Sequence, residues 1–259
     1  MNRPVLFDHL PKCGGSSIAS LLADEYPAHC VLRLDGTDIE RKRAEFCALS
    51  KKDRREIRLI VGHGAGQFRD AVSADFFHVT LLREPVSRVI SFIRYVQREK
   101  SHYLHDELAK PGATVAAFLA NPPTLEIQNF ITTLLSGEQA WRVAREPHVA
   151  SDSAVASLEK NFDLVGAVER IDAFVDQLRD SIRSNTSPLM LPAQILGLPQ
   201  RAPLPRENSA DSEHPDAAHQ FSPAELERIR ELNQADIMLV QKVDELRTSG
   251  AAQKRCRFV

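Results

Sequence analysis

The feature that most constrains the fold is a series of short apolar segments, most of which are followed by a helical pattern. The segments are residues 5–10, 57–62, 76–82 and 162–168. Short buried strands that alternate with amphipathic helices are typical of a parallel sheet covered by helices. We therefore expect an α/β chain with a three-layer, mainly parallel sheet, and its 259 residues are enough to bury a sizeable core.

The rest of the chain fits one domain over residues 1–259. A charged segment at 38–56 and the patterns at about 113–146 predict further helices. A Pro-rich stretch at about 185–221 predicts a long loop. A last helix is expected at about 222–247. Ser222 and Glu225 match a capping box at its start, and Pro223 suits the first helical position.

Composition limits the kinds of partner and the cellular compartment that we expect for the protein. A formal net charge of −2 gives no general attraction to nucleic acid or to an anionic membrane, so any anion site must be local. Cys13, Cys30, Cys47 and Cys256 show neither metal-ligand spacing nor a disulfide framework, which favours a reducing compartment. No apolar run suits a membrane span, and a strand begins almost at once. We expect a cytoplasmic protein without a transmembrane segment.

The loop after the first apolar segment, PKCGGSS, has the composition of an anion site. Gly14 and Gly15 let the main chain approach an anion closely, Ser16 and Ser17 add hydroxyl groups, and Lys12 adds a positive charge. The pattern GxxxxGK[ST] of P-loop proteins is absent, because the lysine precedes the glycines. A Gly-rich turn with a solvated lysine is the alternative interpretation.

Two further segments follow neighbouring apolar runs. LLREPVSRVISF supplies Arg83, Arg88 and Ser91, and guanidinium and hydroxyl groups together suit a second phosphate. The alternative interpretation is that Arg83 and Arg88 form ordinary surface ion pairs with Glu84 or other acidic residues. VGHGAG places His63 between two glycines, where it is a candidate general base. The alternative for His63 is a polar turn histidine bonded to a main-chain carbonyl.

Together these segments resemble the PAPS-dependent sulfotransferases, where PAPS is 3′-phosphoadenylyl sulfate. The resemblance is to the carbohydrate branch with the heparan sulfate and uronosyl 2-O-sulfotransferases and their bacterial relatives. FDHLPKCGGSSIASLL resembles that family's 5′-phosphosulfate loop, VTLLREPVSRVISF its 3′-phosphate segment and VGHGAG its histidine segment. IQNFITTLLSG, FDLVGAVERIDAFVDQL and NQADIMLVQKV resemble later family segments, so the resemblance covers about 5–247.

The resemblance implies a P-loop-like nucleotide-binding architecture and a role for each motif residue. Lys12 would contact the bridging oxygen of the donor and stabilise the leaving phosphate. Residues 14–17 would cradle the 5′-phosphosulfate. Arg83 and Ser91 would hold the 3′-phosphate, with Arg88 as a further donor-binding candidate. His63 would act as general base on the acceptor hydroxyl.

The sequence departs from the family pattern at two motif positions. Cys13 replaces the usual threonine. This removes a hydroxyl group, but the main-chain N–H of Cys13 remains as a candidate contact to PAPS. Glu84 replaces an aspartate. In the Pro-rich loop, Arg206, Asn208 and Ser209 are candidate donor contacts, although a solvated loop is the favoured interpretation.

The expected function is therefore transfer of a sulfuryl group from PAPS to a hydroxyl of a small-molecule or glycan acceptor, with 3′,5′-bisphosphate (PAP) as the product. A carbohydrate or glycoside acceptor is implied by the resemblance alone. The scheme needs no metal, and we expect no nucleic-acid partner. Two alternatives stay open: a P-loop-like kinase that uses ATP, and a non-catalytic relative that binds nucleotide or a partner protein.

Overall fold

A computed structural model describes residues 4–72, 76–185, 220–249 and 256–259. These residues form two compact units, each described here by itself. Unit 1 lies within residues 1–82, 161–208 and 253–259. Unit 2 lies within residues 83–160 and 209–252. The Pro-rich loop expected at 185–221 falls almost wholly outside the described residues.

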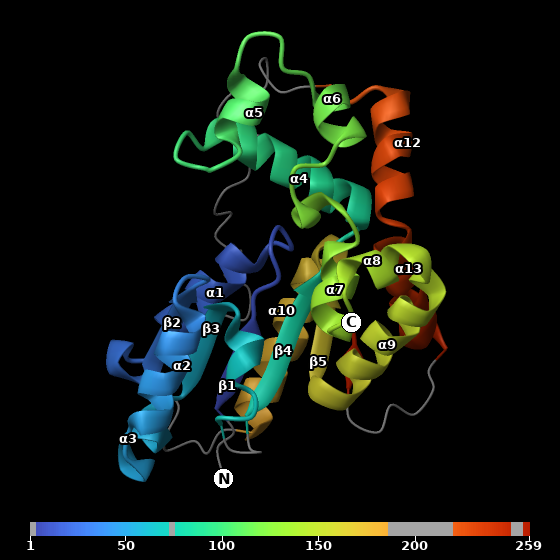
Figure 1. The fold of residues 1–259 in the computed structure, drawn as a ribbon. Coiled ribbons are helices and arrows are strands. Elements are labelled where there is room, and N and C mark those ends of the chain that lie inside the picture. The colour runs from blue at the N-terminus through green and yellow to red at the C-terminus, as the bar shows by residue number, and fades with distance from the viewer. Residues whose placement is uncertain (1–3, 73–75, 186–219, 250–255) are drawn as a thin grey trace. The chain divides into compact units, whose positions relative to one another are not determined.

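Unit 1 contains one six-stranded sheet in the order β2-β3-β1-β4-β5-β6, and every neighbouring pair is parallel (Figure 1). Helices flank this sheet, so the α/β class and the parallel sheet are confirmed, and the arrangement is consistent with three layers. The strands are β1 Val5–Asp8, β2 Val31–Asp35, β3 Leu59–His63, β4 Phe77–Leu82, β5 Leu164–Ala167 and β6 Arg257–Phe258.

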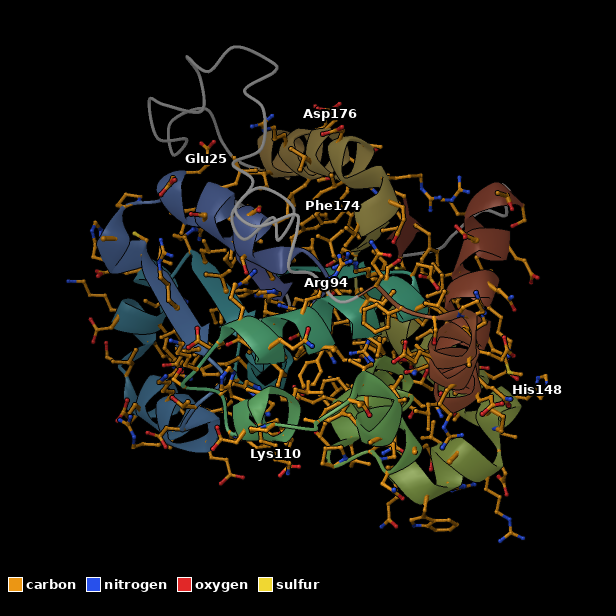
Figure 2. All side chains as sticks on the ribbon, turned by 90° about the horizontal axis from the view of Figure 1, so that it is seen from above. Glu25, Arg94, Lys110, His148, Phe174 and Asp176 are labelled. Carbon is orange, nitrogen blue, oxygen red and sulfur yellow. The ribbon has the colours of Figure 1, made fainter. Side chains whose placement is uncertain are left out.

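The helices of unit 1 follow the strands in the chain. They are α1 Gly15–Asp24, α2 Ile39–Ala48, α3 Lys51–Glu56 and α10 Ile171–Asn185, with short 3-10 turns η1 Ala28–Cys30, η2 Ala65–Phe68 and η4 Val168–Arg170. Helix α10 shows the pattern expected of a covering helix. Phe174 is buried and Asp176 is exposed, and the two lie on opposite sides of the helix (Figure 2). A Cβ added at Gly166 of β5 would lie 2.2 Å from Cδ2 of Phe174, so the helix packs directly onto the strand.

The charged segment at 38–56 forms two helices where one was expected. Helix α2 ends at Ala48, and α3 begins at Lys51. Ser50 is the reason for the new start, because its hydroxyl accepts the main-chain N–H of Asp53 as a side-chain cap.

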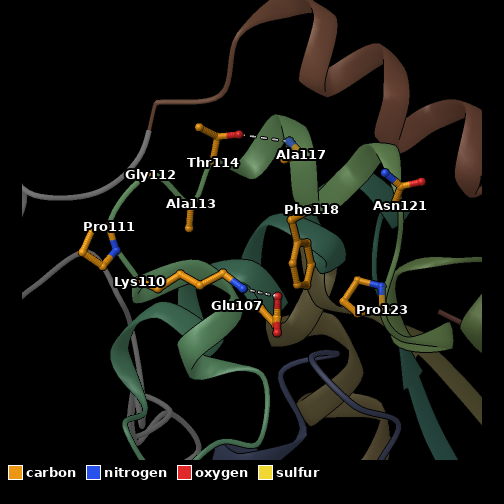
Figure 3. A pocket seen from close by; sticks show the side chains of 10 residues that line it. All are labelled: Glu107, Lys110, Pro111, Gly112, Ala113, Thr114, Ala117, Phe118, Asn121 and Pro123. Carbon is orange, nitrogen blue, oxygen red and sulfur yellow. Dashed lines mark hydrogen bonds and ion pairs between the residues drawn. The ribbon is translucent and has the colours of Figure 1, made fainter.

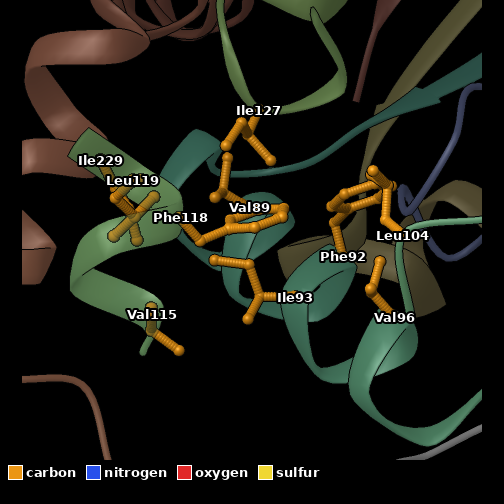
Figure 4. Packing of buried hydrophobic residues seen from close by; sticks show 10 residues of the cluster. All are labelled: Val89, Phe92, Ile93, Val96, Leu104, Val115, Phe118, Leu119, Ile127 and Ile229. Atoms are coloured by element: carbon orange, nitrogen blue, oxygen red, sulfur yellow. The ribbon is translucent and has the colours of Figure 1, made fainter. Parts of the chain in front are cut away.

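Unit 2 is helical. Its elements are α4 Pro85–Arg98, α5 His105–Ala109, α6 Val115–Ala120, η3 Leu125–Ile127, α7 Phe130–Ser136, α8 Ala140–Arg145, α9 Pro147–Asn161, α12 Pro223–Leu232 and α13 Gln234–Thr248. Its core joins α4 to α6 and α12, through side chains such as Val89, Phe118 and Ile229 (Figure 4). Among the helices in the described ranges, none is long and apolar enough to cross a bilayer.

The last helical segment begins as predicted but does not stay continuous. Ser222 and Glu225 form the expected capping box, with a proline at the first helical position. The single helix expected at 222–247 is instead two helices, α12 and α13, which meet at Asn233. The backbone of Asn233 leaves the helical region there, with φ −126° and ψ 31°.

The break at Asn233 is held by what we call the capping clasp, formed by Asn129, Asn233 and Asp236. Asn129 precedes α7, and its side-chain oxygen accepts the N–H of Ala235 at 2.8 Å, in the first turn of α13. Asp236 of α13 accepts the N–H of Thr132 at 2.7 Å, in the first turn of α7. Asn233 accepts the N–H of Asn129 at 3.1 Å. Each helix therefore satisfies N–H groups that the other leaves open.

We expect the capping clasp to dominate the stability of unit 2. Asp236 is buried, and its carboxylate also lies 3.8 Å from the guanidinium of buried Arg88. Asp236→Ala would remove caps from α7 and leave a buried cation without its partner, which costs roughly 3–5 kcal/mol. Asp152→Ala is the control. Asp152 forms an ion pair with Lys242, but its side chain is 71% exposed, so its loss should lower the free energy of unfolding by about 1 kcal/mol or less. Equal urea unfolding midpoints for the two variants would contradict this.

Candidate functional site

The topology of the sheet singles out the carboxyl ends of β1 and β4. In the strand order, the chain leaves β1 toward β2 and β3, which lie on one side of β1. It leaves β4 toward β5, which lies on the opposite side of β4. Adjacent parallel strands whose connections leave in opposite directions form a switch point, where α/β proteins bind ligands. The hydroxyl of Thr80 in β4 donates to the main-chain oxygen of Asp8 in β1 at 2.8 Å, which holds the two strand ends together.

The loop between β1 and α1 has an unusual backbone. Lys12 has φ 62° and Gly14 has φ 66°, so two residues of this short loop lie in the left-handed region. That conformation is ordinary for glycine but uncommon for lysine. Gly14 is the N-cap of α1 and has no side chain to occupy the first-turn N–H groups, and the first turn contains no acidic residue. The start of α1 therefore has no side-chain cap from its own N-cap residue, and its positive dipole end lies next to Lys12 in the sequence.

His63 is fixed against the same loop. It ends β3, and its Nδ1 lies 2.7 Å from the main-chain oxygen of His9, the first residue after β1. The two imidazole rings stack with centroids 4.1 Å apart and planes at 24°. The ring of His9 is also nearly parallel to that of Phe7, with centroids 6.0 Å apart. The ring of His9 therefore has aromatic neighbours on both β1 and β3.

Two glycines are required by this packing. A Cβ added at Gly15 would lie 2.0 Å from Cδ2 of His9, and one added at Gly66 would lie 2.4 Å from Oδ2 of Asp8. No real structure accommodates such contacts without movement. Gly15 of PKCGGSS and Gly66 of HGAG therefore make room for the side chains of His9 and Asp8.

Burial shifts the pKa of two groups of the site toward their neutral forms. Burial lowers the pKa of His9 to about 3, helped by the nearby charges of His63 and Lys12. Burial also raises the pKa of Asp8, against the opposing effects of the Gly66 N–H, Arg69 and His63. A neutral His9 adds no charge of its own, so Lys12 and the dipole of α1 are the sources of positive potential at the start of this helix.

Cys13 is turned inward. Its thiol is buried and lies 3.7 Å from the main-chain oxygen of Pro11, and its main-chain N–H donates to the oxygen of Leu10 at 3.2 Å. The thiol fills the interior of the loop, and the N–H that was a candidate donor contact already has an acceptor. Ser16 and Ser17 are half-buried in the first turn of α1.

The second predicted segment begins directly after β4. Arg83 follows the last residue of that strand, and Pro85 stands at the first position of α4, as expected. Glu84 caps this helix, because its carboxylate accepts the N–H groups of Val86 at 2.9 Å and Ser87 at 2.7 Å. The start of α4 is therefore filled by its own carboxylate, unlike that of α1. Ser91 is half-buried in the second turn of α4.

Arg88 is placed inside unit 2. Its side chain is fully buried, and its guanidinium donates to the main-chain oxygen of Glu126 at 2.9 Å and faces Asp236. A phosphate could reach this group only if the pair with Asp236 were broken. We therefore assign Arg88 to the interior and leave it out of the donor site proposed below.

Other candidates lie apart from these residues. Arg206, Asn208 and Ser209 fall outside the described residues. In the described part of the chain, no cluster of three His, Cys, Asp or Glu side chains could hold a metal ion. Unit 2 has a cavity of about 360 Å³ between α5 and α6, beside the ion pair of Lys110 and Glu107 (Figure 3). None of the predicted site residues lines it.

Sequence reasoning missed two residues of the site, Asp8 and His9. Asp8 ends the first strand and lies against Gly66 of the histidine segment, whereas His9 follows the strand and lies against Gly15 of its own loop. The available signal was the pair of histidines placed at the ends of two apolar segments, His9 and His63. In a parallel sheet such positions lie at one edge.

Comparison with known proteins does not assign a family. The chain matches no protein-family model, and no curated protein matches it. The chemistry of the site is therefore the basis for the function proposed below.

The pKa of His9 predicts how stability depends on pH. Between pH 6.5 and about 3 the unfolded chain protonates His9 and the folded chain does not, so stability falls as pH falls. The expected slope is about 1.4 kcal/mol per pH unit, and it vanishes above pH 6.5. Asp8 acts in the opposite sense, because a raised carboxyl pKa favours the folded state at low pH.

His9→Phe should flatten this dependence, because phenylalanine keeps the stacked ring but does not titrate. Urea unfolding at pH 7.5 and at pH 5.0 measures the slope for wild type and variant. His29→Phe is the control, since His29 is exposed in η1. A slope in His9→Phe equal to that of wild type would show that His9 is not held neutral.

Proposed function

We propose that the protein is a PAPS-dependent sulfotransferase that transfers the sulfuryl group to a hydroxyl of a carbohydrate or glycoside acceptor. The observation that carries the proposal is the joint placement of three features in unit 1. The uncapped start of α1, Lys12 in its left-handed turn and the fixed imidazole of His63 all belong to the ends of the paired strands β1 and β3. An anion cradle beside a candidate base is the arrangement that group transfer to a hydroxyl requires.

The residues present fit the 5′-phosphosulfate end of the donor. The first-turn N–H groups of α1 and the hydroxyls of Ser16 and Ser17 suit its oxygens, and Lys12 supplies the opposing charge. The pKa of His9 is lowered to about 3, so His9 is neutral beside the loop, and burial raises the pKa of Asp8, which acts in the direction of less repulsion of an anion. Cys13 is not part of this set.

His63 takes the proton of the acceptor hydroxyl in this proposal. PAPS, when bound, supplies the sulfuryl group, whose bond to the 5′-phosphate oxygen breaks as the acceptor oxygen bonds to sulfur. Lys12 stabilises the negative charge that collects on the phosphate oxygen. Such loose transfers depend on positioning and charge stabilisation, which are what a fixed loop offers.

Arg83 and Ser91 are the residues that we propose for the 3′-phosphate of the donor. Their support is the resemblance of LLREPVSRVISF to the family segment, together with the position of Arg83 directly after β4. Glu84 already occupies the N–H groups at the start of α4. The guanidinium of Arg83 must therefore provide most of the attraction for a phosphate in this segment.

The kinase alternative is less well supported. In a P-loop the lysine follows the glycines and begins the helix, whereas Lys12 precedes Gly14 and lies in a left-handed turn. A non-catalytic relative remains the second alternative, and the fixed position of His63 beside the loop argues against it. Catalysis and nucleotide preference separate the three functions.

Transfer from PAPS is the direct test. We expect the protein, with ³⁵S-labelled PAPS and a panel of carbohydrate and phenolic acceptors, to give a sulfated product identifiable by mass. His63→Ala should abolish turnover but still bind 3′,5′-bisphosphate, because it removes only the base. Lys12→Ala should lower kcat about a hundredfold or more, the scale of losing a preorganised charge donor.

Two exposed residues of unit 1, His29 and Lys51, supply matched controls. His29→Ala and Lys51→Ala should keep wild-type turnover. Full turnover in His63→Ala would remove His63 as the base. Intact donor binding with no transfer to any acceptor would favour the non-catalytic alternative.

Nucleotide affinity tests the second segment. Wild type should bind 3′,5′-bisphosphate more tightly than the 5′-monophosphate, and Arg83→Ala should remove most of that difference because a charged contact is lost. Calorimetry measures both, with Arg98→Ala as a control at the exposed end of the same helix. Equal affinity of wild type for the two nucleotides would refute the 3′-phosphate site, and preference for ATP with Mg²⁺ would favour a kinase.

A further inference from the structure

The hydrogen bond between His63 and His9 constrains the protonation of His63. A main-chain carbonyl oxygen can only accept, so at 2.7 Å the Nδ1 of His63 must be the donor. A neutral imidazole carries one proton, and with that proton on Nδ1 the other nitrogen, Nε2, has a free lone pair. Among the described residues, no hydrogen bond to Nε2 of His63 competes for it.

The side chain of His63 also has two close neighbours. The imidazole of His9 stacks on one face at 4.1 Å. Gly36, in the loop after β2, approaches the base of the side chain, since a Cβ added there would lie 3.2 Å from Cβ of His63. The ring of His9 is itself fixed, because it rests on the main chain of Gly15 and lies nearly parallel to Phe7.

We propose that His9 is a positioning residue for His63: its carbonyl and its ring together hold the His63 imidazole in the tautomer protonated on Nδ1, with Nε2 as the proton acceptor. The tautomer follows from the geometry alone. Only the use of Nε2 as the base toward an acceptor hydroxyl rests on the proposed function.

The proton then follows a balanced route. The O–H bond of the acceptor breaks, its proton forms the Nε2–H bond of His63, and the imidazole becomes a cation with both nitrogens protonated. The carbonyl of His9 still accepts from Nδ1, and a charged donor strengthens that hydrogen bond. The stacked ring of His9 stays neutral beside the new cation, consistent with its lowered pKa.

Several other groups face His63 and could influence its protonation. Asp8 and His9 lie at the end of β1, and Lys12 lies in the following loop. Asp35 of β2 is the register partner of His63, and its carboxylate is bonded to Lys42 of α2 at 2.7 Å. Among the described residues, none of these side chains is hydrogen-bonded to the ring of His63. The carbonyl of His9 therefore selects the tautomer, and the stacked ring of His9 keeps the imidazole in place to donate to that carbonyl.

The test is a direct reading of the tautomer by NMR. Long-range ¹H–¹⁵N spectra of the ¹⁵N-labelled full chain at pH 8 distinguish a protonated ring nitrogen from a bare one, and His63→Gln identifies the signals. We expect wild-type His63 to show a protonated Nδ1 and a bare Nε2. A protonated Nε2 in wild type would overturn the proposal without any reference to sulfotransferase activity.

Two variants test the ring of His9. His9→Phe keeps an aromatic ring over His63 and should preserve the wild-type pattern. His9→Ala removes the ring, so His63 should lose the pure pattern and show a mixture of tautomers. An unmixed wild-type pattern in folded His9→Ala would overturn the positioning role of the ring.

Kinetics provide a readout that a purely structural role would not give. With a working acceptor, His9→Ala should lower kcat about tenfold or more with little change in KM, whereas His9→Phe should retain more of the rate. If PAPS transfer fails while the tautomer is as expected, the proposed function is wrong and the positioning of His63 stands. If transfer occurs with the opposite tautomer, the positioning is wrong and the function stands.

Discussion

The carboxyl end of β1 is packed so closely that only glycine fits opposite it, and the site in unit 1 depends on this packing. Asp8 lies against Gly66 and His9 against Gly15, at distances that would not admit a Cβ atom. The loop that follows contains the left-handed turn at Lys12. The two glycine-containing motifs therefore form one interlocked element rather than two separate ligand loops.

Two helix starts of this chain use their N–H groups differently. Helix α1 has Gly14 as its N-cap, which offers no side-chain acceptor, whereas the N-cap of α4, Glu84, accepts two first-turn N–H groups through its carboxylate. Helices α7 and α13 satisfy each other through the capping clasp. The same requirement, that every buried N–H has an acceptor, thus distinguishes a candidate ligand site from parts that only hold the fold together.

The sequence predicts the parts of the fold that depend on local pattern. Strands β1 and β4 form within the predicted segments 5–10 and 76–82 because these are apolar, and Ser222 starts a helix because its capping box is local. Strand β2 escapes prediction because it is half-exposed and carries Arg33 and Asp35. The break at Asn233 escapes because its partner Asn129 is 104 residues away. The roles of His9 and Arg88 likewise depend on contacts between distant segments.

The capping clasp also bears on the order in which the chain can fold during synthesis. Helix α7 forms early, but Asn233 and Asp236, which complete its start, emerge from the ribosome about a hundred residues later. The core of unit 2 waits as well, because α12 contributes Ile229 to it. Five of the six strands of unit 1 are complete by Ala167. The nascent chain should therefore carry a nearly finished sheet beside a helical unit that closes only near the end of translation.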